Sequence, residues 1–371
     1  MKRTAIDLLW LRPGKVGGTE FFIRNLLDGL SKLDEDFAFV LLVSRDNADT
    51  FVHYTKDRRF TILQADIASA GIGKRIIWQN LHQNKLLKKH GITRCFEPVY
   101  CKPWLNGGVE YTCVIHDLQA LHYPEYHPFH EIVYSRMCWR MDVLNAARIF
   151  AISNWVREDI IRKYHRKDIR VIYNPILVTK EEVVPFENLK KRYHIDEKGY
   201  FYTIGQLIPH KNIETLLLVM QLVRKENLDL PGKLLITGIN GNAASQLQKK
   251  ITELGLQDNI TFTGFISNEE RNTLYQNCHT FLFPSVFEGF GMPTVEAMYF
   301  GARVVTTQCA CIPEVTQGKA VYVQDPYDAE EWIRKIETKT KQEEPDFGRY
   351  APEYIARIYL EALKEDEWKK R

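Results

Sequence analysis

Short apolar runs alternate with segments of helical period along both halves of this chain, and this alternation restricts the fold more than any other feature. A short apolar run fits a buried strand, whereas apolar residues that recur every three or four positions fit a helix. In the first half, strands are predicted at residues 5–11, 37–43, 111–116, 148–152 and 169–172, helices at 20–33, 74–90 and 131–147, and a further helix that Ser153 caps. In the second half, strands are predicted at 200–204, 233–237, 260–262, 279–283 and 303–306, helices at 213–226, 243–254 and 351–368, and a capping box of Ser267 with Glu270. Strands that alternate with helices predict an α/β fold with two doubly wound, Rossmann-like parallel sheets.

The length of the chain favours two domains, because 371 residues exceed what one hydrophobic core usually holds. Residues 173–198 are polar and interrupted by prolines, and they are predicted to cross between the domains. We therefore predict a first domain at 1–180, a second at 181–345 and a final helix within 346–371. Ligands of doubly wound sheets bind at the carboxyl ends of the strands, which predicts a site in a central cleft between the two sheets.

Composition argues against several classes of protein. A net charge of +3 is too small to indicate a nucleic-acid partner, and 45% hydrophobic with 26% charged residues is ordinary for a globular enzyme. The seven cysteines form no Cys-x-x-Cys pair, so they predict neither a zinc site nor a disulfide framework. Residues 1–12 fit a first strand better than a signal peptide, and no uncharged apolar stretch is long enough to span a bilayer. We expect a cytoplasmic protein.

Residues 283–298 combine a glycine-rich turn, a helix start and two carboxylates in one loop after a predicted strand. Gly289 and Gly291 allow close approach of a ligand, and amides near Met292 at the start of the helix are predicted to meet a diphosphate. Glu288 in the loop and Glu296, predicted on the first helical turn, can accept hydrogen bonds from sugar and ribose hydroxyls. The pattern predicts a sugar-nucleotide site. Two unrelated glutamates on a solvated face are the alternative.

The residues around this pair resemble the retaining glycosyltransferases of family 4, whose pattern is Glu, seven residues and Glu, set in Glu-Gly-Phe-Gly-x-Pro. The resemblance implies a GT-B fold, in which the first domain binds the acceptor, the second binds the nucleotide sugar, and the last helix crosses back to the first domain. It also implies donor contacts from Gly289, Phe290, Gly291 and Met292. Residues 116–126 look most like capsule and O-antigen mannosyl- or rhamnosyltransferases.

Residues 205–212 form a second loop at a predicted strand end and match the family string Gly-x-Leu-x-Pro-Arg-Lys-Asn. The resemblance assigns Lys211 to the donor diphosphate. Gln206 and His210 stand where relatives often carry arginine, so the cationic clamp is lighter and is predicted to use backbone amides as well. Protonation of His210 would make its contribution depend on pH.

Further family positions lie at other predicted strand ends. Gly17 and Gly18 open a helix, and the resemblance places them near the diphosphate and the acceptor, although a glycine turn without a ligand is the alternative. His116 closes a strand and is implied to contact the reacting sugar, the alternative being a structural histidine capped by Asp117. The resemblance also implies donor contacts by Ser153, Gly238 and Phe265, although Gly238 could simply be a turn.

The implied reaction is transfer of a hexose from a nucleotide sugar to a glycan or polyprenyl-linked acceptor, with Glu288, His116 and Lys211 as catalytic residues. Electrostatic stabilisation of the leaving diphosphate should dominate, with no cofactor and no metal. A sugar-nucleotide epimerase on the same fold and a non-catalytic partner subunit are the alternatives. The basic segment 73–90 carries Trp78 and five lysines or arginines, and it predicts weak membrane-surface association, an ordinary surface helix being the alternative.

Overall fold

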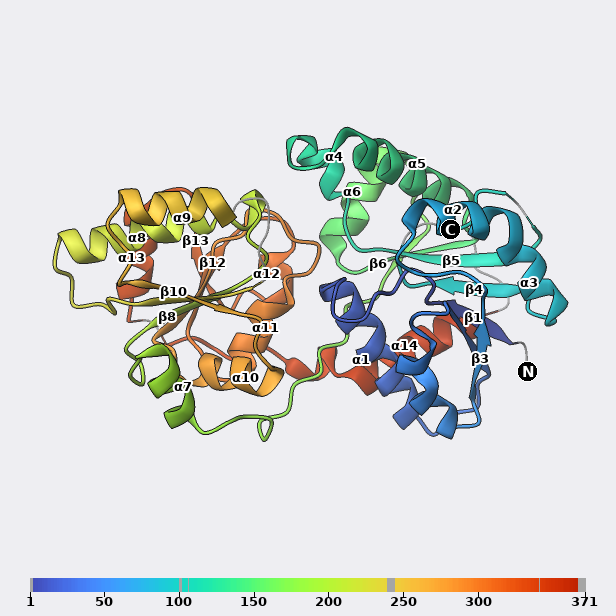
Figure 1. Cartoon of the computed structure of the whole chain (residues 1–371), viewed down its shortest axis with the longest axis horizontal. Coiled ribbons are helices and arrows are strands. Elements are labelled where there is room, and N and C mark those ends of the chain that lie inside the picture. Colours follow the sequence, from blue (N-terminus) through green and yellow to red (C-terminus); the bar gives the residue numbers. More distant parts are fainter. Residues whose placement is uncertain (1–2, 100–101, 106, 239–243, 340, 366–371) are drawn as a thin grey trace. The chain divides into compact units, whose positions relative to one another are not determined.

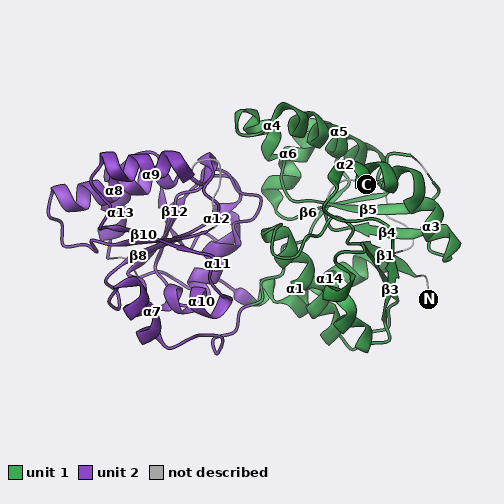
Figure 2. Ribbon diagram, in the orientation of Figure 1, with its two compact units in different colours: residues 1–177, 348–371 green, residues 178–347 purple. Residues whose placement is uncertain are grey.

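A computed structural model describes residues 3–99, 102–105, 107–238, 244–339 and 341–365. The chain forms two compact units (Figure 2): unit 1 comprises residues 1–177 and 348–371, and unit 2 comprises residues 178–347. The chain therefore leaves unit 1 once, forms unit 2 from one continuous segment, and returns.

Unit 1 contains a parallel sheet of seven strands in the order β3-β2-β1-β4-β5-β6-β7. Its strands are β1 (Thr4–Asp7), β2 (Phe39–Val43), β3 (Phe60–Gln64), β4 (Arg94–Glu97), β5 (Glu110–Ile115), β6 (Arg148–Ala151) and β7 (Ile169–Val171). Sequence analysis missed β3 and β4. In β3 only Phe60 is fully buried, and β4 begins and ends on charged residues, so neither strand shows the apolar run that predicts a buried strand.

Helices cover both faces of this sheet (Figure 1). The helices of unit 1 are α1 (Gly18–Lys32), α2 (Ile72–Trp78), α3 (Asn84–Lys89), α4 (Gln119–His122), α5 (Phe129–Asn145), α6 (Asn154–Tyr164) and α14 (Pro352–Lys364), with 3-10 turns η1 (Ala48–Lys56) and η3 (Pro124–Tyr126). The predicted helix at 74–90 is interrupted by a π-helical turn, η2 (Gln79–Gln83), between α2 and α3. Helices α2, α3, α5 and α6 lie on one face, and α1 and α14 lie on the other.

The last helix packs back onto unit 1, as the fold class predicts. Tyr359 of α14 is fully buried, and its ring meets the edges of Phe22 from α1 and Phe96 from β4 at centroid distances of 5.9 and 5.6 Å. Arg148 Nη2 at the start of β6 donates to the Glu365 carbonyl at 2.6 Å. Residues 366–368 of the predicted helix lie outside the described part of the chain.

Unit 2 contains a six-stranded parallel sheet in the order β10-β9-β8-β11-β12-β13. Its strands are β8 (Phe201–Ile204), β9 (Leu234–Thr237), β10 (Ile260–Gly264), β11 (Thr280–Phe283), β12 (Val304–Thr307) and β13 (Val321–Val323). Its helices are α7 (Phe186–Tyr193), α8 (Ile213–Lys225), α9 (Ala244–Glu253), α10 (Asn268–Asn277), α11 (Met292–Tyr299), α12 (Ile312–Val315) and α13 (Ala329–Glu337), with 3-10 turns η4 (Pro209–Lys211) and η5 (Phe347–Tyr350), the second of which runs into unit 1.

Two hydrophobic clusters cover the two faces of this sheet. Helices α8, α9 and α13 bury one cluster around Trp332, and α7, α10 and α11 bury the other around Tyr275. The predicted capping box is confirmed, because Ser267 Oγ accepts from the Glu270 amide and the Glu270 side chain accepts from the Ser267 amide. The prediction that residues 173–198 are only a crossing was wrong, because α7 lies within them and buries Leu189.

Candidate functional site

The loop between β11 and α11 has the glycine geometry that the sequence indicates. Gly291 precedes the helix with a φ of 79°, a left-handed conformation that favours glycine. Pro293 takes the second helical position rather than the first. The Thr294 amide, near the predicted diphosphate contact, is already paired, because it donates to the Gly291 carbonyl at 3.1 Å. Phe290 is 3% exposed, so its ring is buried and is not available to a ligand.

Lys211 and Glu288, predicted from two separate motifs, form an ion pair. Lys211 Nζ lies 2.5 Å from Glu288 Oε1, and the two side chains are 18% and 12% exposed. Lys211 ends the loop after β8, Glu288 lies in the loop after β11, and these two strands are neighbours in the sheet. The fold of unit 2 therefore assembles two of the three predicted catalytic groups at the carboxyl ends of adjacent strands.

Backbone contacts fix the Glu288 loop in place. The Val286 amide donates to the His210 carbonyl at 2.9 Å, which ties the loop to the segment that carries Lys211. Cys311 Sγ donates to the Glu288 carbonyl at 3.2 Å, and Thr307 Oγ1 donates to the Ser285 carbonyl at 2.6 Å. Sequence analysis missed Cys311 and Thr307, and no local pattern connects them with residues some twenty positions earlier.

Glu296 occupies the second turn of α11, not the first as predicted, because the helix begins at Met292. Glu296 Oε2 accepts from the Tyr275 hydroxyl at 3.3 Å and lies 3.7 Å from Arg271 Nε. Burial and the Glu296 carboxylate raise the pKa of Tyr275 well above its usual value, which keeps this hydroxyl a donor. Both partners lie on α10 and were missed in the sequence, where nothing marks them as neighbours of Glu296.

Three neighbouring strands of unit 2 end close to glycine, and their backbones approach closely. A Cβ on Gly238, after β9, would lie 1.8 Å from the Gly205 carbonyl oxygen, after β8. The Gly238 amide donates to the Gly264 carbonyl, at the end of β10, at 3.4 Å. Gly238 therefore has a packing role, and a donor contact from its backbone stays a prediction. Residues 239–243 lie outside the described part of the chain.

The remaining donor positions of unit 2 differ in exposure. Phe265 directly follows β10 and is 82% exposed, so its ring is available to a ligand. Gln206 is exposed as well. His210 is only 4% exposed, and its part in the cationic clamp stays a prediction.

His116 of unit 1 is held in a defined orientation. Its Nε2 lies 2.7 Å from the Pro98 carbonyl oxygen, and its ring meets the edge of Phe22 at a centroid distance of 4.9 Å. A carbonyl can only accept, so Nε2 carries the proton. Burial lowers the pKa of His116 to about 4, which makes the ring neutral at neutral pH. The Asp117 carboxylate accepts from the Gln119 amide at 3.0 Å.

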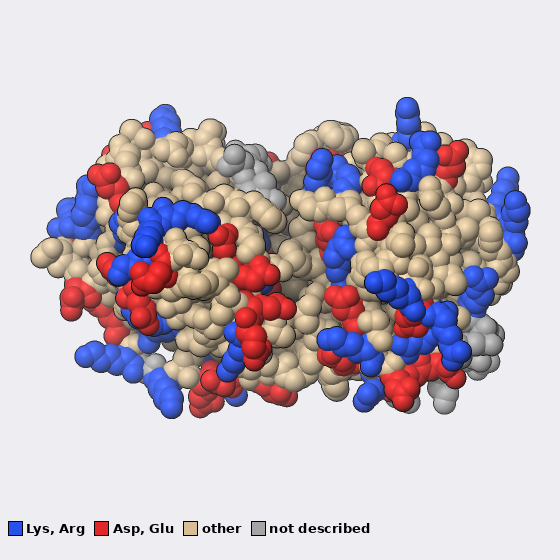
Figure 3. Space-filling model, turned by 60° about the horizontal axis from the view of Figure 1, so that its bottom comes forward, with Lys and Arg blue, Asp and Glu red and all other residues tan. Residues whose placement is uncertain are grey.

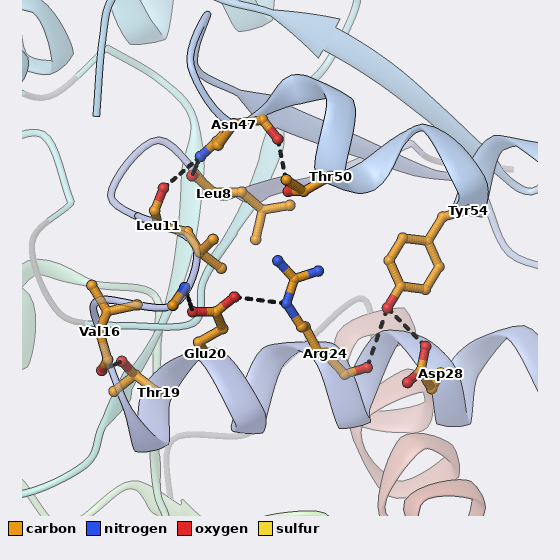
Figure 4. A network of polar contacts seen from close by, with 11 residues as sticks. Leu8, Leu11, Val16, Thr19, Glu20, Arg24, Asp28, Asn47, Thr50 and Tyr54 are labelled. Carbon is orange, nitrogen blue, oxygen red and sulfur yellow. Dashed lines mark hydrogen bonds and ion pairs between the residues drawn. The ribbon is translucent and has the colours of Figure 1, made fainter. Parts of the chain in front are cut away.

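The glycine-rich loop of unit 1 is anchored by Glu20, a role that sequence analysis did not assign (Figure 4). Glu20 Oε2 accepts from the Gly14 amide at 2.8 Å, and Oε1 pairs with Arg24 Nε at 2.9 Å. Gly17 precedes α1, and Gly18 is its exposed first residue.

Ser153 caps α6, as predicted. Its hydroxyl accepts from the Val156 amide at 3.2 Å, and the side chain is fully buried. A contact between the donor and the Ser153 side chain stays a prediction.

Comparison with known families shows which protein family the chain belongs to. The model for glycosyltransferase family 4 matches residues 16–179, and the model for glycosyl transferases group 1 matches residues 185–353. The chain belongs to glycosyltransferase family 4. The predicted family is thereby confirmed, and with it the class of activity, glycosyl transfer. This family 4 glycosyltransferase carries the Lys211 and Glu288 pair within the second matched region.

Two curated relatives are similar to this glycosyltransferase over part of their length. The chain is 29% identical over 256 residues to the O-antigen chain mannosyltransferase RfbU of Salmonella typhimurium, covering 68% of this chain and 67% of that protein. It is 31% identical over 220 residues to the O-antigen chain mannosyltransferase B of Escherichia coli, covering 58% of this chain and 57%, less than two thirds, of that protein.

A solved structure shares the fold. The glycosyltransferase superposes on HepE of Anabaena, solved in complex with UDP and glucose, with a TM-score of 0.67 over 98% of this chain and 95% of that chain, at 15% identity. The predicted fold class, GT-B with two Rossmann-like units, is confirmed. No helix among the described residues combines the length and the apolar character that crossing a bilayer requires.

Proposed function

We propose that this glycosyltransferase moves a hexose from a nucleotide-sugar donor to a glycan or polyprenyl-linked acceptor, with retention of configuration, in surface-polysaccharide synthesis. The observation that carries the proposal is the Lys211 and Glu288 pair at the carboxyl ends of β8 and β11. An ammonium group has three N–H donors, of which Glu288 uses one, so Lys211 can also donate to a diphosphate. A cation and a carboxylate in contact thus suit a ligand that carries phosphates next to hydroxyls.

The residue roles follow from this chemistry. Lys211, with the amides of Gly17 and Gly18 and those near Gly291 and Met292, stabilises the leaving diphosphate. Glu288 accepts from hydroxyls of the transferred sugar and Glu296 from those of the ribose. His116 contacts the reacting sugar, and the exposed Phe265 meets the nucleotide base.

The proposed reaction needs no base from the protein. The acceptor oxygen forms a bond to the anomeric carbon on the face that the donor leaves, and the bond from that carbon to the diphosphate oxygen breaks. The proton of the acceptor hydroxyl passes to the departing diphosphate. We propose that this step uses neither a cofactor nor a metal ion.

We propose mannose as the transferred sugar, because the two curated relatives are mannosyltransferases. The test is a thermal-shift screen of the full chain with GDP-mannose, GDP, UDP-glucose and dTDP-rhamnose, followed by transfer from the donor that stabilises most. Stabilisation by GDP-mannose with transfer to an O-antigen acceptor is expected, and Lys211→Ala should abolish both. Stabilisation by none of the four would refute the proposed class of donor.

We propose weak peripheral association with the inner face of the cell membrane through residues 72–89. Ile77 and Leu81 are 62% and 51% exposed on this helical segment, with the exposed Lys85 and Lys88 further along it. Exposed apolar side chains beside lysines suit an anionic bilayer surface. Cosedimentation with phosphatidylglycerol vesicles should fall for Ile77→Ser with Leu81→Ser. Val52→Ser in η1, 51% exposed, is the matched control, and equal loss in both variants would refute the segment.

The distribution of charges on the face shown in Figure 3 is relevant to whether the protein binds nucleic acid. Acidic and basic side chains are interspersed over this face rather than gathered by sign. Nucleic-acid binding typically uses a basic stripe on one face. Together with the net charge of +3, this mixed face supports our proposal that nucleic acid is not a partner.

A further inference from the structure

Four amide side chains on the segment from η2 to α3 point inward, a feature that sequence analysis overlooked among the lysines of this segment. Gln79 and Gln83 reach a buried carboxylate, Asn80 accepts from the Trp104 amide at 2.7 Å, and Asn84 donates to the Leu105 carbonyl at 2.9 Å. Gln79 and Gln83 are the first and last residues of the π-helical turn, and such turns occur frequently at functional sites.

The carboxylates that receive these amides are Asp7 and Glu97, at the carboxyl ends of the paired strands β1 and β4. Gln83 Nε2 donates to Asp7 Oδ2 at 2.9 Å and to Glu97 Oε1 at 3.2 Å. Gln79 Nε2 adds a bond to Asp7 Oδ2 at 3.1 Å. Asp7, Gln83 and Glu97 are at most 1% exposed, so one amide group joins two acids in the interior of unit 1.

The two acids differ in their surroundings. Asp7 also accepts from the Leu9 amide at 2.8 Å and feels the positive charge of Arg75. Glu97 has a contact with the Cys95 thiol at 3.7 Å and feels the negative charges of Asp7 and Asp142. Burial and these charges raise the pKa of Glu97 well above its usual value. Burial raises the pKa of Asp7 as well, but its donors and Arg75 oppose that rise, so Glu97 is the acid that keeps a proton.

The remaining titratable groups around Glu97 do not change which of the two acids keeps a proton. Burial raises the pKa of Cys95 and of Tyr111 well above their usual values, so both side chains stay neutral. Burial also raises the pKa of Cys113, on β5, well above its usual value, and the charges of Lys102 and Arg166 oppose that rise. Asp142, from α5, accepts from the Lys102 amide at 3.2 Å.

Glu97 is joined to the proposed catalytic histidine through one residue. Pro98 follows Glu97 directly, and its carbonyl accepts from His116 Nε2 at 2.7 Å. Any shift at the end of β4 therefore moves the acceptor that determines the tautomer of His116. With Nε2 protonated, Nδ1 is the ring nitrogen that can accept a hydrogen bond from a hydroxyl.

We propose that Gln83 and Glu97 are positioning residues for His116: the amide bridge holds the end of β4 so that the Pro98 carbonyl keeps His116 in its Nε2–H tautomer. Nδ1 then accepts a hydroxyl of the bound sugar. Only one part of this inference rests on the proposed function, namely that a sugar hydroxyl is the ligand of Nδ1. The tautomer of His116 is a property of unit 1 alone.

The first measurement is a long-range ¹H–¹⁵N spectrum of the histidine-labelled full chain, in which His116→Asn identifies the signal. Gln83→Met removes the bridge with little change in shape, and Asn84→Leu is the matched control. Asn84 is a neighbouring buried amide that bonds Leu105 and Tyr111 and not the acids. Gln83→Met should shift His116 to a tautomer mixture and lower kcat about 10- to 100-fold with little change in KM for the donor. Asn84→Leu should leave the tautomer intact.

A second variant keeps the inference testable if Gln83→Met fails to fold. Glu97→Gln retains a neutral side chain, so it should keep kcat within about threefold of the parent at pH 7. It should also remove the loss of activity that ionisation of Glu97 causes in the parent at high pH. An unchanged tautomer in Gln83→Met, or an unchanged high-pH limb in Glu97→Gln, overturns the inference. A shifted tautomer in a chain that transfers no sugar would instead overturn the proposed function.

Discussion

Gly238→Ala tests the close approach of the strand ends that carry the proposed donor site. A Cβ at this position would lie 1.8 Å from the Gly205 carbonyl oxygen and 2.8 Å from its carbon. Non-bonded carbon and oxygen atoms need about 3 Å, so the Gly205 carbonyl must move by more than about 1 Å. The obstacle is backbone rather than the flexible end of a side chain, and the ends of β8 and β9 therefore have to separate.

The expected cost follows from this overlap. Insertion of a methyl group into packed structure costs about 1–3 kcal/mol. For a unit of this size each kcal/mol lowers Tm by about 2–4 °C, so we expect a decrease of about 2–12 °C. Gly205 begins the loop that carries Lys211, whose Cδ lies 3.6 Å from the Cβ position of Gly205. Displacement by about 1 Å should therefore also lower the transfer rate, by up to about 100-fold.

The matched control is Gly232→Ala, just before the amino end of the same strand. Gly232 is exposed, and a Cβ there would meet nothing within 4 Å. We expect its effect on stability to stay within about 0.5 kcal/mol. The assays are differential scanning calorimetry and initial rates of sugar transfer for both variants and the parent. If Gly238→Ala behaves like Gly232→Ala in both assays, the inferred close approach and its link to Lys211 are wrong.

Three further predictions concern single groups. Lys211→Met leaves the Glu288 carboxylate without its cation. We expect the free energy of unfolding in urea to fall by about 1–3 kcal/mol and the transfer rate to fall more than 100-fold. A transfer rate within a few-fold of the parent would contradict the assignment. Ser267→Ala removes one half of a capping box and should cost about 1 kcal/mol without changing KM for the donor, whereas a change in KM would imply a role in the site. Because the pKa of His116 is lowered to about 4 in the folded chain, the unfolded chain binds more protons than the folded chain between pH 6.5 and 4. The contribution of the buried, neutral His116 to stability is therefore complete above pH 6.5 and is lost as the pH falls toward 4. Chemical denaturation of the parent and of His116→Asn at pH 7 and pH 5 should show a smaller decrease in the variant, and equal decreases would refute the lowered pKa.

Several features of this chain could be predicted because their causes are local. Alternating apolar runs and helical periods predicted the two parallel sheets, and the residues around Glu288 and Lys211 predicted the family. The capping box at Ser267 was equally predictable, since all of its atoms come from four consecutive residues. The short strands β3 and β4 were missed because partner strands, rather than an apolar run of their own, stabilise them.

The contacts between distant segments depend on the tertiary structure. The sequence determined which residue types stand at the strand ends, but the order of the strands decided that Lys211 and Glu288 meet. The same holds for Arg271 beside Glu296 and for the Gln83 bridge between Asp7 and Glu97. Parallel sheets bring together strand ends that lie far apart in the chain, and the geometry of a hydrogen bond between such ends is determined only when both segments are packed.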